Sequence, residues 1–226
     1  MEITTRHQPS FAVARCGLSG GEAIRAESGA MMATSAGVSV EAKAQGGILK
    51  SLGRMALGGE SFFISTFTAP QGGGWVDVAA NLPGDLLTNE VISGRALNIQ
   101  RGSFLACEST VEIDTKWGGF KNLFGGEGGF LVHASGNGTV ILSCYGALDM
   151  IDLADGESVV VDSGHMVAYD ETVSATLRRI SSTMQSLKSG EGFVFDFVGP
   201  GRLYVQSRNP RALIDWLTLN LPFSRS

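Results

Sequence analysis

Three stretches of this chain decide its fold, because they align with one another without a gap. They read GEAIRAESGAMMATSAGVSV (Gly21–Val40), GRALNIQRGSFLACESTVEI (Gly94–Ile113) and GESVVVDSGHMVAYDETVSA (Gly156–Ala175). Four columns are identical: Gly21/Gly94/Gly156, Gly29/Gly102/Gly164, Ala33/Ala106/Ala168 and Val38/Val111/Val173. The alignment indicates one supersecondary unit copied three times. We call the stretches the first, second and third copies.

Each copy has the pattern of short strands. In the first copy Ile24 and Ala26 alternate with polar residues, and the apolar pair Met31-Met32 follows the turn glycine Gly29. Alternation with a period of two is typical of a strand with one buried face. Each opening glycine precedes a strand, where we expect a positive φ. We predict an all-β protein of three repeated, double-stranded β-helix-like sandwich units, at residues 1–83, 84–148 and 149–226, which together form one compact domain.

A single helix is predicted at the C-terminus. Asn209 suits a helix N-cap and Pro210 the first helical turn. The apolar residues Leu213, Trp216 and Leu217 then recur with helical spacing until Pro222 ends the pattern. Such a helix could cover a strand edge of its own chain or dock on a neighbouring molecule.

The composition excludes several classes of protein. The chain has 226 residues, 43% of them hydrophobic, and 31 glycines. A net charge of −5 and the absence of a dense basic run disfavour nucleic acid as a partner. The polar N-terminus and the lack of a long apolar run predict a cytoplasmic protein.

The chain resembles a known family in three features. An irregular insert follows each copy, and each insert ends at a Gly-Glu pair: Gly59-Glu60, Gly126-Glu127 and Gly190-Glu191. The other two features are the sequence Ser28-Gly29-Ala30-Met31-Met32 and the closing Ser-Arg-Asn-Pro-x-x-Leu-x-x-Trp at residues 207–216. They are similar to uncharacterised bacterial and archaeal proteins related to the fungal altered-inheritance-of-mitochondria protein. The resemblance implies three units like the tryptophan RNA-binding attenuation protein subunit about a pseudo-threefold axis. It implies no enzyme activity and no cofactor, and its mitochondrial relatives suggest a part in organising membrane-associated complexes.

Two groups of residues are candidates for binding. One is a column of three carboxylates: Glu60, Glu127 and Glu191. An approximate threefold rotation would bring these carboxylates towards a common axis. The alternative is that each is solvated beside its turn glycine. The other is a set of apolar and basic residues in the inserts: Ile48, Leu49, Lys50, Trp117, Phe120, Lys121, Met184, Leu187 and Lys188. These residues would form a partner-binding rim or would only cap the sandwiches. Three weak sites on one rim would gain avidity.

Residues for catalysis or metal binding are sparse. The histidines His7, His133 and His165 lack ligand spacing, so we expect no metal site. We therefore predict a non-enzymatic scaffold, a homo-oligomer that presents a threefold-related surface to protein partners or a membrane. The alternative is a small-ligand-binding β-module. A hydrolase that uses Cys107 or Cys144 is the least favoured reading, because no neighbour of either cysteine in sequence supports an activated thiolate.

Overall fold

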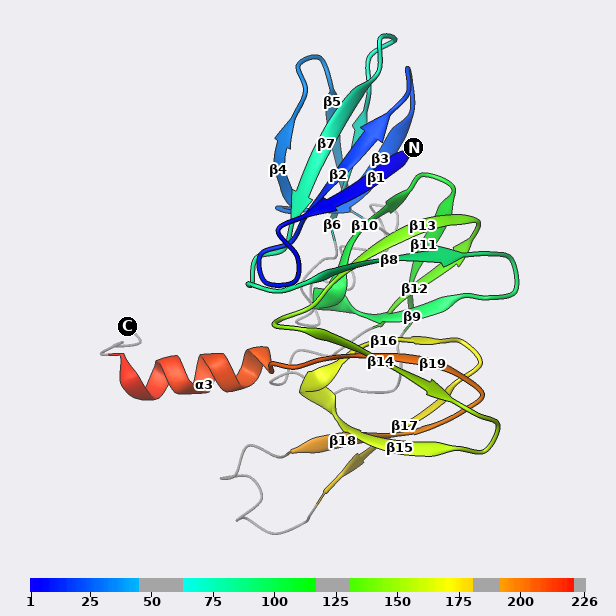
Figure 1. The fold of residues 1–226 in the computed structure, drawn as a ribbon, viewed down its shortest axis with the longest axis vertical. Coiled ribbons are helices and arrows are strands. Elements are labelled where there is room, and N and C mark those ends of the chain that lie inside the picture. The colour runs from blue at the N-terminus through cyan, green and yellow to red at the C-terminus, as the bar shows by residue number, and fades with distance from the viewer. Residues whose placement is uncertain (45–62, 117–130, 181–191, 222–226) are drawn as a thin grey trace.

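The computed structural model describes residues 1–44, 63–116, 131–180 and 192–221. These residues form four β-sheets, two short 3-10 turns and one helix, so the prediction of a mainly β protein with one C-terminal helix is confirmed. The sheets lie one over another along the longest axis of the molecule (Figure 1).

The first sheet has the order β1-β2-β7-β4, and the second has the order β5-β6-β3-β10-β13-β8. Their strands are β1 (Glu2–Arg6), β2 (Val13–Leu18), β7 (Gly74–Ala79) and β4 (Met31–Thr34), then β5 (Ser39–Ala44), β6 (Phe63–Thr68), β3 (Ala23–Glu27), β10 (Phe104–Glu108), β13 (Gly138–Ser143) and β8 (Leu86–Val91). The third sheet has the order β11-β12-β9-β16-β19-β14, and the fourth β15-β18-β17. Their strands are β11 (Val111–Lys116), β12 (Leu131–Gly136), β9 (Leu97–Gln100), β16 (Met166–Asp170), β19 (Gly201–Gln206) and β14 (Leu148–Leu153), then β15 (Ser158–Asp162), β18 (Phe193–Val198) and β17 (Ser174–Arg179).

A hydrophobic core fills each of the three spaces between adjacent sheets. Ile24 and Val76 belong to the core between the first and second sheets, and Ile99 and Leu142 to the next. The last core contains Phe195 and Phe197, whose ring centroids lie 5.3 Å apart. Because the two middle sheets have a core on each face, their strands are apolar on both faces, as in the run FLAC of β10.

Consecutive copies are joined by strand pairing, and both joints have the same register. The first strand of the first copy, β3, pairs antiparallel with β10 of the second copy, with Ala26 opposite Ala106. In the same way β9 pairs with β16, with Ile99 opposite Ala168. In the sequence alignment these two residue pairs occupy the same columns. Each six-stranded sheet therefore contains strands from two consecutive copies.

The arrangement about a pseudo-threefold axis is not confirmed. A ring closed within the chain would need β15 of the third copy to pair with β4 of the first. Among the described strands β4 pairs with β7 alone and β15 with β18 alone, and the two belong to the sheets at opposite ends of the stack (Figure 1). The described strands form an open stack, because each joint leads to a new sheet instead of back to the first.

The opening glycines of the three copies adopt the backbone conformation that we predicted. Gly21, Gly94 and Gly156 have φ values of 76°, 81° and 74°. A residue with a side chain rarely adopts such a φ, which explains why glycine recurs at this column.

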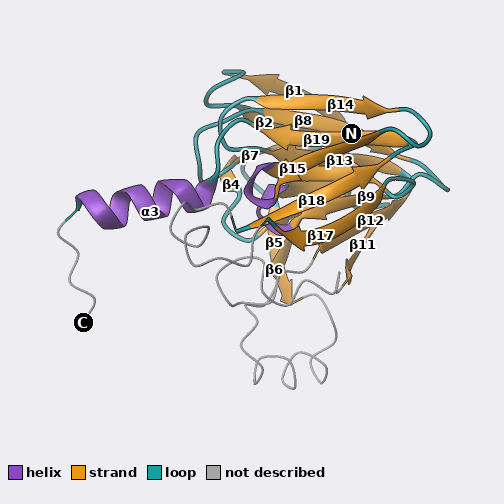
Figure 2. Ribbon diagram, turned by 90° about the horizontal axis from the view of Figure 1, so that it is seen from below, coloured by secondary structure: helices purple, strands orange, loops and turns teal. Residues whose placement is uncertain are grey.

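Helix α3 (Pro210–Asn220) begins and ends where the sequence predicted. The Asn209 side chain caps it by accepting a hydrogen bond from the Arg211 backbone N–H at 2.8 Å. The helix extends away from the sheets, with no buried residue, instead of covering a strand edge of its own chain (Figure 2). In the described part of the chain no helix combines the length and the apolar composition needed to span a membrane.

Candidate functional site

All twelve binding residues predicted from the sequence lie outside the described residues. These are the rim residues Ile48, Leu49, Lys50, Trp117, Phe120, Lys121, Met184, Leu187 and Lys188, and the carboxylates Glu60, Glu127 and Glu191. The rim and the carboxylate column therefore stay predictions.

The three cysteines are free thiols in buried positions. Burial raises the pKa of Cys16 and of Cys107 to about 12, and it also raises the pKa of Cys144. The Cys144 thiol lies 3.3 Å from the Gly146 carbonyl oxygen, to which it can donate. At neutral pH these thiols are protonated, whereas a nucleophilic cysteine acts as the thiolate.

The side chains of His133 and His165 contact separate partners. His133 Nδ1 lies 3.2 Å from Asn98 Oδ1, and its Nε2 lies 3.7 Å from the Glu171 carboxylate. His165 Nδ1 lies 2.7 Å from the Gln206 carbonyl oxygen. Within the ranges that the structure describes, no three His, Cys, Asp or Glu residues gather as metal ligands.

The edge strand β4 exposes an apolar pair that is buried in the other two copies. Met31 is 44% exposed and Met32 is 53% exposed. The residues in the same alignment columns, Phe104-Leu105 and Met166-Val167, are all at most 2% exposed. The difference arises because β10 and β16 each have a strand of the preceding copy beside them, while β4 has none among the described strands.

The edge strand β15, at the opposite end of the stack, shows the complementary exposure. Val160 is 55% exposed, and Val159 and Val161 are partly buried. In the corresponding strands Ile24 and Ala26 of β3, and Leu97 and Ile99 of β9, are at most 1% exposed. Thus the first and last sheets each present one apolar strand edge.

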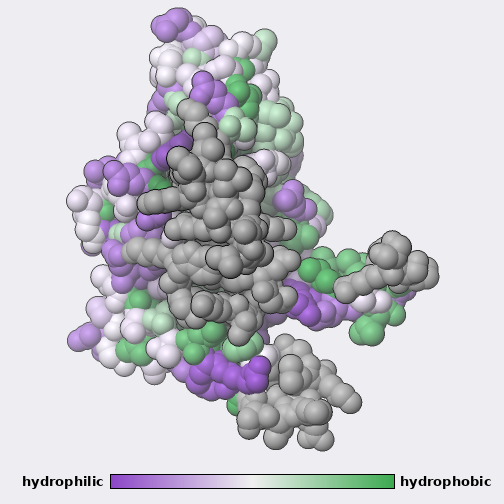
Figure 3. Space-filling view, turned by 180° about the vertical axis from the view of Figure 1, so that it is seen from behind, coloured by the Kyte–Doolittle hydropathy of each residue, from purple (hydrophilic) through white to green (hydrophobic). Residues whose placement is uncertain are grey.

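Helix α3 is a third apolar surface. Ile214, Trp216 and Leu219 are 54%, 60% and 85% exposed. Arg211 and Asp215 form an ion pair of 3.0 Å on the polar side of the helix. Apolar side chains cover much of the rest, and the hydropathy colouring shows them on the projecting helix (Figure 3). A helix with such a wide apolar face is normally packed against another element.

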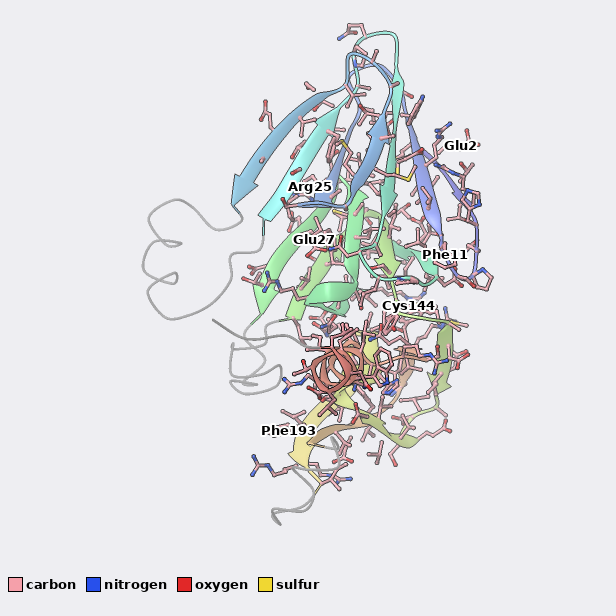
Figure 4. The ribbon with its side chains drawn as sticks, turned by 90° about the vertical axis from the view of Figure 1, so that its left-hand side faces the viewer. Glu2, Phe11, Arg25, Glu27, Cys144 and Phe193 are labelled. Atoms are coloured by element: carbon pink, nitrogen blue, oxygen red, sulfur yellow. The ribbon has the colours of Figure 1, made fainter. Side chains whose placement is uncertain are left out.

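One cavity of about 270 Å³ lies where the second sheet meets the base of α3. The residues that line it include Glu27, Gln100, Ser103, Tyr145 and Gln206, together with Pro210 of the helix. Burial raises the pKa of Glu27 to about 7, against an opposing effect of Arg101. Glu27 and Cys144, which also lines the cavity, lie on the side of the molecule from which α3 projects (Figure 4). A carboxyl group that titrates near neutral pH among amide and hydroxyl groups suits a small polar ligand.

No sequence pattern predicted the role of Glu27 as a cavity residue or the exposure of Met31 and Met32. Glu27 follows a strand in one copy only, since Gln100 and Asp162 occupy its column. The apolar pair is visible in the alignment, but its exposure depends on whether a neighbouring strand is present. Exposure of this kind is a property of position in the stack and has no local pattern.

Comparison with known proteins supplies a family. Residues 3–208 match the family described as mitochondrial biogenesis AIM24. An uncharacterized protein of Streptococcus pyogenes is 28% identical over 232 residues, which cover 99% of this chain and 92% of that protein. A Streptococcus pyogenes protein with a crystal structure has a TM-score of 0.82 and 26% identity, over 97% of this chain and 99% of that one. Since the family match spans all four sheets, this chain belongs to the mitochondrial biogenesis AIM24 family.

Proposed function

We propose that this protein is a non-enzymatic scaffold that holds a protein partner on helix α3. The observation that carries the proposal is the exposure of Ile214, Trp216 and Leu219 on a helix that projects from the sheets. Leaving such a face in water costs about 25 cal/mol for each Å² of apolar area, so a partner that covers it gains that free energy. An amphipathic helix laid in an apolar groove is a common mode of protein recognition.

The charge of α3 favours a protein over a membrane surface. The only basic residue of the helix is Arg211, and Asp215 neutralises it at 3.0 Å. Helices that bind membrane surfaces usually have several Lys or Arg residues on the polar face, which attract anionic lipids.

Site-specific photocrosslinking tests the scaffold proposal. A photoreactive phenylalanine analogue replaces Leu219 on α3 or, as a control, the exposed Glu112 on β11, and the proteins are irradiated in cells. We expect one protein to crosslink at position 219 and not at 112. The purified pair should then bind at least about tenfold more weakly with Trp216→Ser.

The proposal fails if binding to that protein is unchanged by Trp216→Ser. It fails equally if position 219 crosslinks to nothing while the protein sediments with phosphatidylcholine–phosphatidylserine vesicles. That second result would assign α3 to a membrane surface.

The cavity beside Glu27 supports the alternative function, a small-ligand-binding module. Its volume of about 270 Å³ matches a molecule of amino-acid size, and Glu27 could accept from an amine or hydroxyl group of the ligand. Thermal-shift measurements with amino acids, polyamines and polyols test this function. A ligand that raises the melting temperature of the wild type and not of Glu27→Gln supports the alternative, and no shift with any of these compounds at millimolar concentration removes it.

The proposal also covers the division of the chain into units and its location in the cell. We propose three units like the tryptophan RNA-binding attenuation protein subunit, at residues 1–83, 84–148 and 149–226. The equal registers of the two joints between strands support this division. Free, buried cysteines support a cytoplasmic location, because reducing compartments keep thiols unpaired.

A further inference from the structure

We infer that molecules of this protein associate head to tail, with β15 of one molecule pairing antiparallel with β4 of the next. The partner at each end of the stack is thus a second copy of the same chain. This inference goes beyond the scaffold function and does not depend on it, because α3 takes no part in the joint.

The register of the two joints within the chain specifies the joint between chains. The pairs Ala26–Ala106 and Ile99–Ala168 occupy the columns of Val161 and Ala33, so Val161 should lie opposite Ala33. The pairs Arg25–Cys107 and Asn98–Tyr169 likewise place Val160 opposite Thr34.

The combined sheet would repeat the order already present in the chain. Joining β15 to β4 gives β17-β18-β15-β4-β7-β2-β1. Its first six strands correspond, copy for copy, to β5-β6-β3-β10-β13-β8 and to β11-β12-β9-β16-β19-β14. The two end sheets therefore complete each other, and neither needs a new kind of contact.

Burial favours the same partner. Leu105 lies in a core with Ile24 and Ala26 of the preceding copy, and Val167 lies in a core with Leu97 and Ile99. Met32 occupies their column and is 53% exposed. In the joint it would pack beside Val159 and Val161, which already border the last core. The joint thus buries the apolar pair Met31-Met32 at one end and the valines at the other.

The strand β4 already has the shape that the joint requires. A bulge shifts the register between Met31 and Ala33, as it does between Phe104 and Ala106 and between Met166 and Ala168. A bulge on an edge strand often blocks further pairing, but β10 and β16 have the same bulge and still pair on the opposite side. Strand β15, SVVVD, also lacks the lysine or proline with which edge strands commonly prevent association.

A joint of this kind is heterologous, since it brings together two different surfaces. An assembly to which another molecule is added still has one β4 edge and one β15 edge open. Association therefore continues until a ring closes or a filament grows. The assembly should consequently exceed a dimer.

Light scattering coupled to gel filtration tests the inference with a matched pair of variants. Met32→Lys places a charge in the joint, whereas Met150→Lys places the same charge on β14, where Met150 is 52% exposed and the corresponding residues are Arg15 and Thr88. We expect wild type and Met150→Lys to form assemblies larger than a dimer. Met32→Lys should be monomeric, with a dissociation constant raised at least about 100-fold because the lysine loses water without gaining a partner. A wild type that stays monomeric at high micromolar concentration, or an assembly that survives Met32→Lys, overturns the inference.

Disulfide crosslinking tests the direction of pairing and does not rely on a charged variant that could misfold. Thr34→Cys and Val160→Cys are made in separate proteins, mixed and oxidised; the native cysteines are buried. We expect a crosslinked pair from the mixture and little from either protein alone. Val198→Cys on the neighbouring strand β18, 36% exposed, is the control partner for Thr34→Cys. Crosslinking from Thr34→Cys alone would indicate a head-to-head contact and contradict the proposed joint.

Discussion

Replacing Asp77 by Asn should lower the free energy of unfolding of the protein by roughly 2 kcal/mol at pH 7. Asp77 lies on β7 and is 1% exposed. Its carboxylate accepts hydrogen bonds from Arg15 on β2, at 2.8 and 2.9 Å, and from Arg6 on β1, at 2.6 and 3.3 Å. These bonds connect three of the four strands of the sheet.

The magnitude follows from the pKa of Asp77. The hydrogen bonds from Arg15, together with those from Arg6, lower this pKa from 3.8 to about 2, against the opposing effect of burial. The difference corresponds to roughly 2 kcal/mol of stability. Because the folded pKa lies below the unfolded one, the contribution is complete above about pH 4. It is lost as the pH falls through 2.

Urea unfolding of wild type and Asp77→Asn at pH 7 and at pH 2.5 measures the effect. The difference in unfolding free energy should shrink by more than half at the lower pH. Asp196→Asn is the control: its partner Arg178 lies 2.6 Å away, but both side chains are about a third or more exposed, so the change should cost less than about 1 kcal/mol. Equal effects of the two substitutions, or an Asp77→Asn effect that is independent of pH, would refute the reasoning.

Three further substitutions test the description of the structure. Glu27→Gln should stabilise the protein by about 1–3 kcal/mol at pH 8 and by little at pH 4.5. Burial raises the pKa of Glu27 in the folded protein to about 7, so the native state loses stability as the pH rises from 4.5. Urea unfolding at the two pH values measures the difference. Tyr204→Phe removes a 2.9 Å hydrogen bond from the third sheet to Asn89 of the second and should cost about 1 kcal/mol in the same assay. Trp216→Ser should shift the free energy of unfolding by less than about 0.5 kcal/mol, because Trp216 is exposed; a larger loss would mean that α3 packs on its own chain in solution.

Much of the fold follows from local sequence, and the open ends do not. The alternation at Ile24 and Ala26 predicted two side chains that are fully buried, and Asn209-Pro210 predicted the start of α3. The expected closure about an axis had no such basis. Closure depends on the angle between successive units, which long-range packing sets, and no pattern in the aligned columns encodes it.

The candidate sites illustrate the same limit. Met31-Met32 and Met166-Val167 are chemically alike, yet the first pair is half exposed and the second is buried. Only the sheet order shows which copy lies at the end of the stack. Glu27 stands out because residues from three parts of the chain enclose a cavity beside it, and their proximity is not visible in sequence.

Hydrogen exchange of the backbone amides tests the head-to-tail joint most directly, because it compares like strands within one molecule. In wild type at assembling concentrations, the amides of β15 that do not bond to β18 should be as protected as the corresponding amides of β3 and β9, and this protection should disappear on dilution or in Met32→Lys. Rapid exchange of these β15 amides, and of the β4 amides that do not bond to β7, at every concentration, with β3 and β9 still protected, would contradict the claim that the two end strands are halves of one joint.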